Sequence, residues 1–542
     1  MRGHDAIAQA LVDQGVDTVF GVLGDANLFI GDCLMRVHHV NYVAATHEAS
    51  AVMMAQGWAK ATGRLGVATV THGPGLTNTM TALVEGAKAG VPMILVSGDT
   101  PTADLHHLQN VHQQAFVEAT GCGFHAVRTA DTMVEDVAIA MRRAWAERRP
   151  VVLNLPLELE WEEVDYAAAP VVQPPARALD ADPDALDKAL GILATAQRPL
   201  ILAGRGAVLS GAHDALAELA EVLGAPVATS LLGSSYFRGE AGAVGVFGTL
   251  ATPVGSEVIH HADCVIAFGA SLNRYTTHEG TLLAGKAVIQ CDVDPLRIGS
   301  SVPIDAGVVG DATRIATTMT GMLRAAGHQP SSFRSGDLTA ALAGYDPASS
   351  FTDQSTRTHV DPRSAVLRLD ALLPADRSVV VDAGRFMLDA LTLPVPDPTS
   401  LITTHAFGSI GLGTAAAVGA GVARPDRPLV LLVGDGGFMM GGIQELHTGV
   451  HLGLDLIVVL FNDGSYGAEH VQLVNKGMDT SSSLHHWPDL PAVAAALGCE
   501  AVAVHNLDDF ALAAKLVEER QPGRPVFIEI SVDPDVVSRI AR

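Results

Sequence analysis

Two polar turns in the last quarter of the chain offer oxygen ligands at the ends of apolar runs. Asp435 follows closely after the run Pro428–Leu432, and Asn462 follows closely after the run Leu456–Leu460. Runs of this length are typical of buried strands, and the apolar residues between them recur at helical spacing. We therefore expect a strand–helix–strand unit in which both side chains lie at neighbouring strand ends, where open α/β sheets bind their ligands.

The oxygen atoms at these turns suit a magnesium ion bound together with a diphosphate. The Asp435 carboxylate, the Asn462 amide oxygen and the backbone carbonyl of Gly464 are hard ligands, and Mg²⁺ completes its octahedral shell with phosphate oxygens and water. Neighbouring glycines allow the backbone to approach a phosphate, and the N-terminus of the next helix favours negative charge. An ordinary Asp-Gly turn is the alternative, because both residues are common in turns.

Two further carboxylates, Asp25 and Glu48, stand at predicted element ends in the first third of the chain. Asp25 follows the apolar run Thr18–Leu23, and an N-cap for the next helix is its simplest alternative role. Glu48 begins a helix made almost wholly of small and apolar residues. Burial there would raise the pKa of the carboxyl group and make it a competent acid at neutral pH, whereas a carboxylate favoured by the helix dipole is the alternative.

Together these motifs resemble those of the thiamine-diphosphate enzymes in the decarboxylase and acetolactate-synthase superfamily. The Gly-Asp-Gly turn at 434–436 followed by Asn462 is similar to the metal–diphosphate signature of that family. The segment Thr46–Gly63, which begins Thr-His-Glu and ends Gly-Trp-Ala-Lys-Ala-Thr-Gly, is similar to its pyrimidine-binding segment. The resemblance implies that Glu48 bonds N1′ of the cofactor aminopyrimidine and promotes the tautomer that activates the thiazolium.

The resemblance also implies a set of cofactor contacts in the last third of the chain. It assigns to Ile410 the apolar support that keeps the cofactor bent, and to the backbone at Gly408 an acceptor for the 4′-amine; a plain core role is the alternative for Ile410. The implied cofactors are thiamine diphosphate and Mg²⁺, the metal being held by Asp435, Asn462 and Gly464. The implied cofactor-binding residues are Glu48, Gly384, Gly408, Ile410, Gly434, Asp435, Gly436, Gly437, Asn462, Tyr466 and Gly467.

The composition is that of a large globular protein rather than a partner of nucleic acid or lipid. The chain has 542 residues, of which 48% are hydrophobic and 17% charged, and its net charge is −25. Strong negative charge argues against nucleic acid and anionic membranes as partners. The uncharged stretch Ala406–Ala423 is mostly Gly and Ala, and no signal-peptide core follows Met1, so neither a membrane span nor a leader is expected. Five separated cysteines without a CxxC pair favour a reduced, cytoplasmic protein.

Length and shifts in composition favour an α/β protein of three doubly wound parallel-sheet domains. The predicted domains are a pyrimidine-binding domain at 1–166, a central domain at 185–326 and a diphosphate- and magnesium-binding domain at 359–542. A Pro-rich stretch at 167–176 and a polar stretch at 327–358 are expected to join them.

The central domain gives little indication of a cofactor of its own. Its turn Gly204-Arg205-Gly206 lacks the third glycine of a dinucleotide-binding fingerprint. In relatives resembling the acetolactate synthases this domain carries a non-catalytic FAD, and in others it is empty or holds a nucleotide. The sequence does not decide between these alternatives and does not itself indicate FAD. A dehydrogenase, which would need the complete fingerprint, is not supported.

Side chains expected beside the cofactor indicate two reaction branches. Asp25, His107 and Glu469 resemble the proton-handling residues of 2-oxo acid decarboxylases, whereas Gln109 matches the glutamine-containing loop of the acetolactate-synthase branch. Both branches remove CO₂ from a 2-oxo acid; protonation then gives an aldehyde, and addition to a second carbonyl gives a 2-hydroxyketone. The catalytic candidates are Glu48, Asp25, His107, Gln109 and Glu469. A decarboxylase with carboligase side activity is the preferred prediction, and a synthase-type transferase is the alternative.

His72 departs from the family pattern, which commonly has a small residue at this position. The imidazole could supply an extra hydrogen-bond donor near the pocket, or it could be a structural histidine whose hydrogen bonds are satisfied. The structural role is the preferred prediction.

The resemblance further implies that a monomer cannot hold a complete site. In the family the pyrimidine-binding domain of one subunit pairs with the diphosphate-binding domain of another, so at least a homodimer is expected, and a homotetramer is common. The expected substrate is a small 2-oxo acid. A thiamine-diphosphate-binding paralogue without catalysis is the alternative of another class, and the presence of Glu48, Asp435 and Asn462 argues against it.

Overall fold

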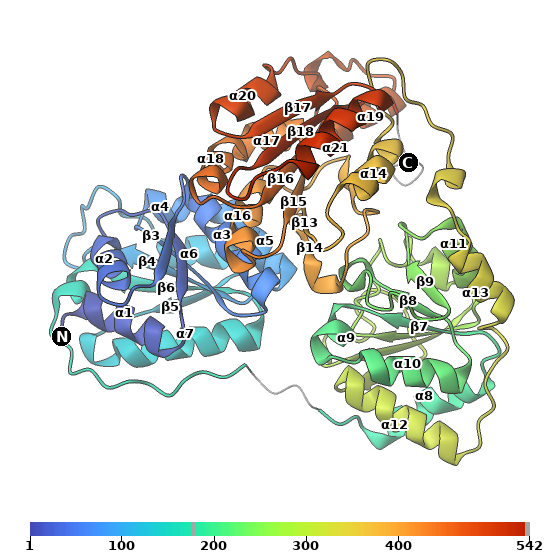
Figure 1. The fold of residues 1–542 in the computed structure, drawn as a ribbon. Helices are drawn as coiled ribbons and strands as arrows, with labels where there is room; N and C mark the ends of the chain where they lie inside the picture. Colours follow the sequence, from blue (N-terminus) through green and yellow to red (C-terminus); the bar gives the residue numbers. More distant parts are fainter. Residues whose placement is uncertain (175–178, 537–542) are drawn as a thin grey trace. The chain divides into compact units, whose positions relative to one another are not determined.

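The computed structural model describes residues 1–174 and 179–536, and it contains three parallel six-stranded sheets with helices packed around them (Figure 1). The predicted fold class is confirmed. Strand order is β2-β1-β3-β4-β6-β5 in the first sheet, β12-β11-β10-β7-β8-β9 in the second and β14-β13-β15-β16-β18-β17 in the third. In each sheet, strands that follow one another in sequence are added first toward one edge and later toward the other. The point at which the direction changes is called a switch point, and open α/β sheets bind their ligands there.

The first sheet places its carboxyl edge beside the turns that carry Asp25, His72 and Gln109. Its central strands are buried along their whole length, as expected for a parallel sheet that is covered on both faces. The strands are β1 Thr18–Gly21, β2 Asn41–Ala44, β3 Gly66–Val70, β4 Met93–Asp99, β5 Gly123–Ala126 and β6 Pro150–Pro156. The helices are α1 Gly3–Asp13, α2 Leu28–Arg36, α3 Glu48–Thr62, α4 Pro74–Thr77, α5 Met80–Ala89, α6 Gln113–Ala119 and α7 Met133–Glu147.

The third sheet carries the turns of the predicted metal–diphosphate site. The strands are β13 Ser378–Val381, β14 Leu401–Thr403, β15 Leu429–Gly434, β16 Leu456–Asn462, β17 Glu500–Val504 and β18 Val526–Ser531. The helices are α14 Pro362–Leu372, α15 Met387–Ala390, α16 Gly413–Ala423, α17 Asp435–Gly441, α18 Ile443–His451, α19 Gly467–Asn475, α20 Leu490–Ala496 and α21 Phe510–Glu518. Strands β15 and β16 are parallel neighbours in register from Leu429↔Leu456 to Gly434↔Phe461, so the predicted strand–helix–strand unit is present.

The second sheet forms the centre of a separate compact unit. Its strands are β7 Pro199–Ala203, β8 Val227–Thr229, β9 Ala243–Val246, β10 Cys264–Phe268, β11 Ala287–Asp292 and β12 Ala306–Val309. Its helices are α8 Pro183–Thr195, α9 Arg205–Ser210, α10 His213–Leu223, α11 Pro253–His261, α12 Ala312–Ala325 and α13 Gly336–Ala343. A Cβ on Gly204 would lie 2.3 Å from the carbonyl oxygen of Gly269. Position 204 therefore needs glycine because the turn after β7 packs closely against the turn after β10.

Contacts along the chain divide it into two compact units. The first takes in the chain from Met1 to the linker, Gln354–Leu391, and the chain from Ile402 onward, so the first and third sheets lie in one unit. The second takes in the chain between the linker and Asp353 together with Thr392–Leu401. Within the second unit the Arg238 guanidinium donates to the Val395 carbonyl oxygen at 3.2 Å.

The joining segments contain structure that the sequence did not predict. The polar stretch 327–358 includes helix α13, which has no fully buried residue. Residues 175 and 176 of the predicted Pro-rich linker, and residues 537–542 of the predicted third domain, lie outside the described residues. Across the part of the chain that the structure describes, no helix has the length and apolar character needed to cross a bilayer.

Helices α3 and α16 hold the two predicted cofactor-binding regions of the first unit together. A Cβ on Gly57 of α3 would lie 2.1 Å from the Ala416 carbonyl oxygen, and a Cβ on Gly419 of α16 would lie 1.9 Å from the Met54 carbonyl oxygen. Real Cβ atoms do not approach a backbone oxygen so closely, so each helix needs a glycine where the other crosses it. Both helices are buried almost completely, and their small residues belong to one hydrophobic core with the strands of both sheets.

Replacing Gly419 by alanine tests this packing. We expect Gly419→Ala to destabilise the folded protein by about 3 kcal/mol, because the new methyl group would displace a buried helix backbone. The measurement is the midpoint of thermal unfolding by calorimetry. Gly191 of α8 is the matched control, since a Cβ there has open space around it. Gly191→Ala should be neutral or stabilising by roughly 0.5–1 kcal/mol, and equal effects at both glycines would contradict the packing argument.

Candidate active site

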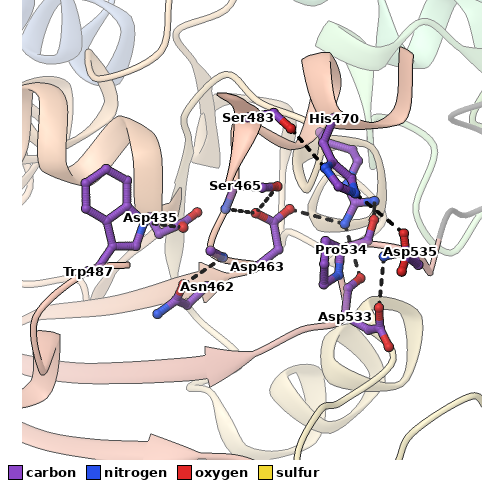
Figure 2. Close-up of polar contacts among 12 residues, drawn as sticks. Asp435, Asn462, Asp463, Ser465, His470, Ser483, Trp487, Asp533, Pro534 and Asp535 are labelled. Atoms are coloured by element: carbon purple, nitrogen blue, oxygen red, sulfur yellow. Dashed lines mark hydrogen bonds and ion pairs between the residues drawn. The ribbon is translucent and has the colours of Figure 1, made fainter. Parts of the chain in front are cut away.

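Asp435 is the first residue of α17 and lies directly after β15, as the sequence predicts. Its side chain is buried, and the indole N–H of Trp487 donates to its Oδ2 at 2.6 Å (Figure 2). Burial, helped by the nearby Asp463 carboxylate, raises the pKa of Asp435 to about 7, although the bond from Trp487 opposes the shift. A buried carboxylate short of positive charge is a favourable ligand for a divalent cation.

Asn462 ends β16, and its amide is held in one orientation. The Nδ2 group donates to the Glu529 carboxylate of β18, and Oδ1 accepts the backbone N–H of Gly464 at 3.0 Å. Glu529 thus turns the amide oxygen toward the loop at 463–466, which is the orientation that a metal ligand needs. Gly464 has a φ of 61°, a left-handed conformation that favours glycine.

The loop after β16 is fixed by a network around Asp463 (Figure 2). Oδ1 of Asp463 accepts from the backbone N–H of Ser465 at 2.9 Å and from its hydroxyl at 2.7 Å. Oδ2 pairs with the Arg385 guanidinium at 3.2 Å, and Arg385 also donates to the Pro534 carbonyl oxygen at 2.5 Å. The network keeps the strand-end loop in place without using Asp435 or Asn462.

Glycines near Asp435 let neighbouring side chains pack directly against the backbone of the turn. A Cβ on Gly436 would lie 2.8 Å from the Tyr466 ring, and a Cβ on Gly437 would lie 2.7 Å from Oδ2 of Asp382. At Gly434 a Cβ would lie 3.1 Å from the Phe386 ring, and at Gly467 it would lie 2.6 Å from Oδ2 of Asp463. The turn therefore has a bare backbone at a helix N-terminus, which fits a phosphate.

The donor set at this edge fits Mg²⁺ with a diphosphate better than it fits a metal held by protein alone. It comprises one buried carboxylate, one oriented amide oxygen and the loop that carries the Gly464 carbonyl. Within residues 1–174 and 179–536, no three His, Cys, Asp or Glu side chains gather into a metal site. Magnesium commonly uses one or two protein ligands and completes its shell with phosphate oxygens and water.

Asp382, directly after β13, holds the loop that the resemblance assigns to the cofactor. The carboxylate is fully buried and accepts backbone N–H groups of the segment 411–413 at 2.8–3.3 Å and the Thr404 hydroxyl at 3.0 Å. Burial raises the pKa of Asp382 to about 6 against these bonds. Asp382 therefore fixes the loop at 404–413.

That loop presents Gly408 and Ile410 at its surface. Gly408 has a φ of 82° and is exposed, and Ile410 is half-buried beside Gly437. The alternative for Ile410 was a plain core residue. A core side chain is normally fully buried, whereas Ile410 is half-buried and lies on a loop. Gly384, which follows β13, has a φ of 134°.

Glu48 begins α3, but it is half-buried in this chain, whereas a fully buried side chain was expected. Its Oε2 accepts from the Asn78 amide at 2.9 Å, across the Gly-rich turn that follows β3. The ring of His47 caps the same helix by accepting the backbone N–H of Ala49 at 3.1 Å. Asn78 is thus the group that orients the predicted pyrimidine-binding carboxylate.

Glu445 connects the third sheet's helices to the segment that leads into Glu48. This buried side chain of α18 accepts the backbone N–H of Thr46 at 3.1 Å and the Thr46 hydroxyl at 2.5 Å. Its other oxygen accepts from the Thr448 hydroxyl at 2.8 Å. Helix α18, which follows the predicted metal–diphosphate turn, therefore positions the start of α3.

Glu85 makes the reciprocal connection. This buried side chain of α5 accepts the backbone N–H groups of Ala406 at 3.1 Å and Phe407 at 2.7 Å, immediately before Gly408. Lys60 of α3 donates to the Thr403 carbonyl oxygen at 2.8 Å on the same segment. Sequence reasoning missed Glu85 and Glu445, although a lone carboxylate within an apolar helix was the signal that identified Glu48.

The structure brings three of the reaction candidates together at the carboxyl edge of the first sheet. Asp25 is exposed after β1 and accepts from the Thr71 hydroxyl at 2.7 Å. His107 and Gln109 lie in the loop after β4, where Nδ1 of His107 accepts the backbone N–H of Gln109 at 3.2 Å. Between them lies His72, whose ring packs against that of His107 with centroids 5.2 Å apart.

Glu469 does not join this group within the chain. It lies on α19, exposed, in the region of the third sheet. The adjacent His470 is buried instead and contacts the Ser483 hydroxyl at 3.0 Å (Figure 2). The Glu469 assignment thus stays a prediction that depends on a second subunit.

Comparison with known proteins agrees with this arrangement. Residues 1–119 match the thiamine pyrophosphate enzyme N-terminal TPP binding domain, residues 186–319 the central domain and residues 382–530 the C-terminal TPP binding domain. The fold and the two strand-end sites define an enzyme of the thiamine-diphosphate-dependent class, and the chain belongs to the thiamine pyrophosphate enzyme family.

Several relatives are similar to the chain over nearly their whole length. The chain is 29% identical to acetolactate synthase isozyme 3 large subunit of Escherichia coli, over 98% of this chain and 95% of the relative. It is 26% identical to acetolactate synthase large subunit of Haemophilus influenzae, with the same coverage. It is 28% identical to sulfoacetaldehyde acetyltransferase of Roseovarius nubinhibens, over 99% of this chain and 93% of the relative.

Replacing Trp487 tests its role beside Asp435. We expect Trp487→Phe to weaken Mg²⁺ binding in the presence of thiamine diphosphate about tenfold, a typical effect of losing a partner that orients a metal ligand. The loss should be larger at pH 6.5 than at pH 8, because a proton competes for a carboxylate whose pKa is raised to about 7, and the indole bond lowers that pKa. The measurement is titration calorimetry.

Trp145 of α7 provides the control for this variant, because it lies outside the elements that form the site. Trp145→Phe should leave magnesium affinity unchanged at both pH values. If Trp487→Phe binds Mg²⁺ as tightly as the wild type, Trp487 does not orient the metal ligand.

Proposed function

We propose that this protein is a Mg²⁺- and thiamine-diphosphate-dependent carboligase that transfers the acyl unit of a decarboxylated 2-oxo acid to a second carbonyl compound. The observation that carries the proposal is its similarity over 98% of the chain to acetolactate synthase large subunits, together with complete candidate half-sites in both cofactor-binding regions. From the sequence alone a decarboxylase was the preferred prediction and a synthase-type transferase the alternative. The similarity to acetolactate synthases favours the transferase.

In this proposal the two half-sites bind different parts of the cofactor. When bound, thiamine diphosphate accepts the electron pair released as CO₂ leaves the 2-oxo acid. Asp435, Asn462 and the Gly464 carbonyl hold Mg²⁺ with the diphosphate at the third sheet. Glu48, oriented by Asn78, holds a proton at N1′ of the aminopyrimidine at the first sheet. Gly408 and Ile410 fix the bend of the cofactor on the loop that Asp382 and Glu85 keep in place.

A decarboxylase that protonates the acyl unit and releases an aldehyde is the second candidate. The gathering of Asp25, His72 and His107 at one sheet edge favours it, because protonation requires titratable groups close to the reacting carbon. A paralogue that binds the cofactor without catalysis is the candidate of another class.

The three candidates give different products from a single assay. The protein is incubated with thiamine diphosphate, Mg²⁺ and a panel of small 2-oxo acids, with and without an aldehyde acceptor. We expect CO₂ release with a 2-hydroxyketone as the main product. Aldehyde as the sole product would establish the decarboxylase instead, and no CO₂ release from any acid would support the non-catalytic paralogue.

Glu48→Gln tests the proton assigned to N1′. An amide cannot hold that proton, so we expect exchange of the C2 proton of bound cofactor to slow by about 10² or more. The measurement is exchange into deuterated water followed by NMR of the released cofactor, and calorimetry shows that the variant still binds it. Exchange at the wild-type rate would exclude this role for Glu48.

We also propose that the active protein is at least a homodimer, with a homotetramer as the expected form. The half-exposed Glu48 supports this, because a proton-holding carboxylate works better when desolvated, and a second chain would provide the cover. Exposed apolar side chains support it as well: Leu105 and Leu108 follow β4, and Met440 and Met478 lie beside the third sheet.

Mixing two inactive variants tests the shared site. Glu48→Gln and Asp435→Asn protomers are unfolded together and refolded as mixed dimers. If each site takes Glu48 from one chain and Asp435 from the other, one site of every mixed dimer is intact, and about a quarter of all sites should be active. Failure to regain activity, with mixed dimers shown by mass spectrometry, would mean that both residues serve a site within one chain.

Five free cysteines, all buried, support a reducing compartment, and we propose the cytoplasm. The cysteine thiols have raised pKa values because of their burial, with values near 11 for Cys122 and Cys499. Such thiols are poor nucleophiles, which also argues against a cysteine in the reaction.

A further inference from the structure

Three histidines among the described residues have a buried ring nitrogen without a hydrogen-bond partner: His72, His405 and His485. Both ring nitrogens of His72 are unpartnered and its side chain is fully buried, so the expectation of a structural histidine with satisfied bonds is wrong. His485 packs against the rings of Tyr466 and Trp487 beside the predicted metal loop. His405 belongs to neither group, and its unpartnered Nδ1 is a feature of the cofactor loop, where a buried polar atom without a bond costs free energy.

The backbone around His405 is fixed although its side chain is not. The N–H of Thr404 donates to the Val381 carbonyl oxygen of β13 at 3.2 Å. The carbonyl oxygen of His405 itself accepts the N–H of Gly408 at 3.2 Å. His405 therefore closes the turn that ends at Gly408, the residue that the resemblance assigns to the 4′-amine of the cofactor.

Glu85 of α5 holds the two residues in the middle of that turn. Its fully buried carboxylate accepts the N–H of Ala406 at 3.1 Å and the N–H of Phe407 at 2.7 Å. Nζ of Lys60 lies 4.0 Å from Oε1 of Glu85 and donates to the Thr403 carbonyl oxygen at 2.8 Å. A carboxylate and an ammonium group from two helices thus act together on the segment that contains His405.

The imidazole of His405 lies in the field of these two charges. Burial lowers the pKa of His405 below its ordinary value, while Glu85 raises it and Lys60 lowers it. Because the ordinary value is about 6.5, the ring is neutral at pH 7 and becomes a cation only in more acidic solution.

Two further charged groups at this loop are directed elsewhere. Nζ of Lys88, also on α5, lies 5.7 Å from the centre of the Phe407 ring. The Asp382 carboxylate accepts N–H groups of the segment 411–413 on the far arm of the loop. Glu85 and Lys60 are therefore the charges that a proton on His405 would disturb.

A proton on His405 would change the hydrogen bonds of the turn. Both nitrogens of an imidazolium are donors, and the nearby acceptor of opposite charge is the Glu85 carboxylate. That carboxylate already accepts from Ala406 and Phe407, so a charged donor competes with the two backbone N–H groups. The imidazolium also repels the Lys60 ammonium group, which weakens the bond to the carbonyl oxygen before the turn.

We propose that His405 is a positioning residue that restricts tight binding of thiamine diphosphate to pH values at which its imidazole is neutral. The inference rests on the proposed function in one respect, which is the assignment of Gly408 to the cofactor. With a neutral imidazole the turn at 405–408 keeps its bonds to Glu85 and holds Gly408 in place as an acceptor. With an imidazolium those bonds are lost, and the aminopyrimidine loses a fixed partner.

The pH dependence of cofactor affinity tests the proposal. Thiamine diphosphate is titrated into protein containing Mg²⁺ at pH 7.5 and at pH 5.5, and calorimetry gives the affinity. Protonation of Asp435 also weakens Mg²⁺ binding in acid, so the quantity compared is the difference between the wild type and His405→Asn. We expect the wild-type affinity to fall about tenfold further than that of the variant, which is the effect of losing one hydrogen bond to a charged group.

Three controls separate His405 from other effects of acid. Mg²⁺ with inorganic pyrophosphate occupies the metal–diphosphate half-site alone, so its affinity should change with pH equally in the wild type and His405→Asn. His405→Gln, a second neutral variant, should behave as His405→Asn does and guards against a folding defect. His125→Asn should keep the wild-type dependence, because that imidazole is bonded to Asp136 at 2.7 Å on the edge strand β5.

The outcomes distinguish this inference from the proposed function. If thiamine diphosphate affinity depends on pH equally in the wild type and both His405 variants, the inference is wrong even where carboligation is confirmed. If the affinity difference is found but no 2-oxo acid is turned over, the proposed function fails and the role of His405 stands. A protein that binds no thiamine diphosphate at either pH would contradict both.

A second measurement follows the proton itself. Protein with ¹³C-labelled histidine rings is titrated by NMR, and the His405 signal is assigned by its loss in His405→Asn. We expect Glu85→Gln to lower the pKa of His405 and Lys60→Met to raise it. Coupling between a proton and a ligand is reciprocal, so addition of Mg²⁺ and thiamine diphosphate should lower this pKa as well. A His405 pKa that stays the same when the cofactor binds would overturn the proposal.

Discussion

The close contact between helices α3 and α16 is the constraint on which the rest of the first unit depends. Each helix has a glycine where the backbone of the other passes, so the two helices approach within a distance that no side chain allows. Helix α3, which begins at Glu48, and helix α16, which follows the loop at 404–413, therefore belong to one tightly packed core. Buried Glu85 and Glu445 then fix the loops at either end of it by accepting hydrogen bonds across the boundary.

This arrangement has a consequence for how a shared site would operate. If each active site draws on two chains, the half-sites that face each other belong to different subunits, whereas α3 and α16 connect half-sites of one subunit. Glu85 and the helix pair would then connect the loop at 404–413 with the predicted pyrimidine-binding half of the other site. Rigid packed elements of this kind are suited to couple two sites, because they do not deform gradually.

The sequence predicted most of the fold and the cofactor-binding turns because those features are local. Apolar runs, Gly-rich turns and their spacing identified the strand ends at Asp435 and Asn462 without any knowledge of distant contacts. The partners that orient those residues, Trp487 and Glu529, lie 52 and 67 residues away along the chain, and spacing carries no information about them. The burial of Glu48 was overestimated for a related reason: the apolar pattern of α3 describes its contact with α16, not the surroundings of its first residue.

The chain connects the two compact units at several points. The second unit contains residues from the segment before Asp353 and again from Thr392–Leu401, so up to residue 536 the chain passes between the units four times. A single break in the linker would leave the units joined covalently through the remaining crossings. The central domain is therefore connected to the first unit at both of its ends, so it cannot be exchanged by simple fusion at one terminus.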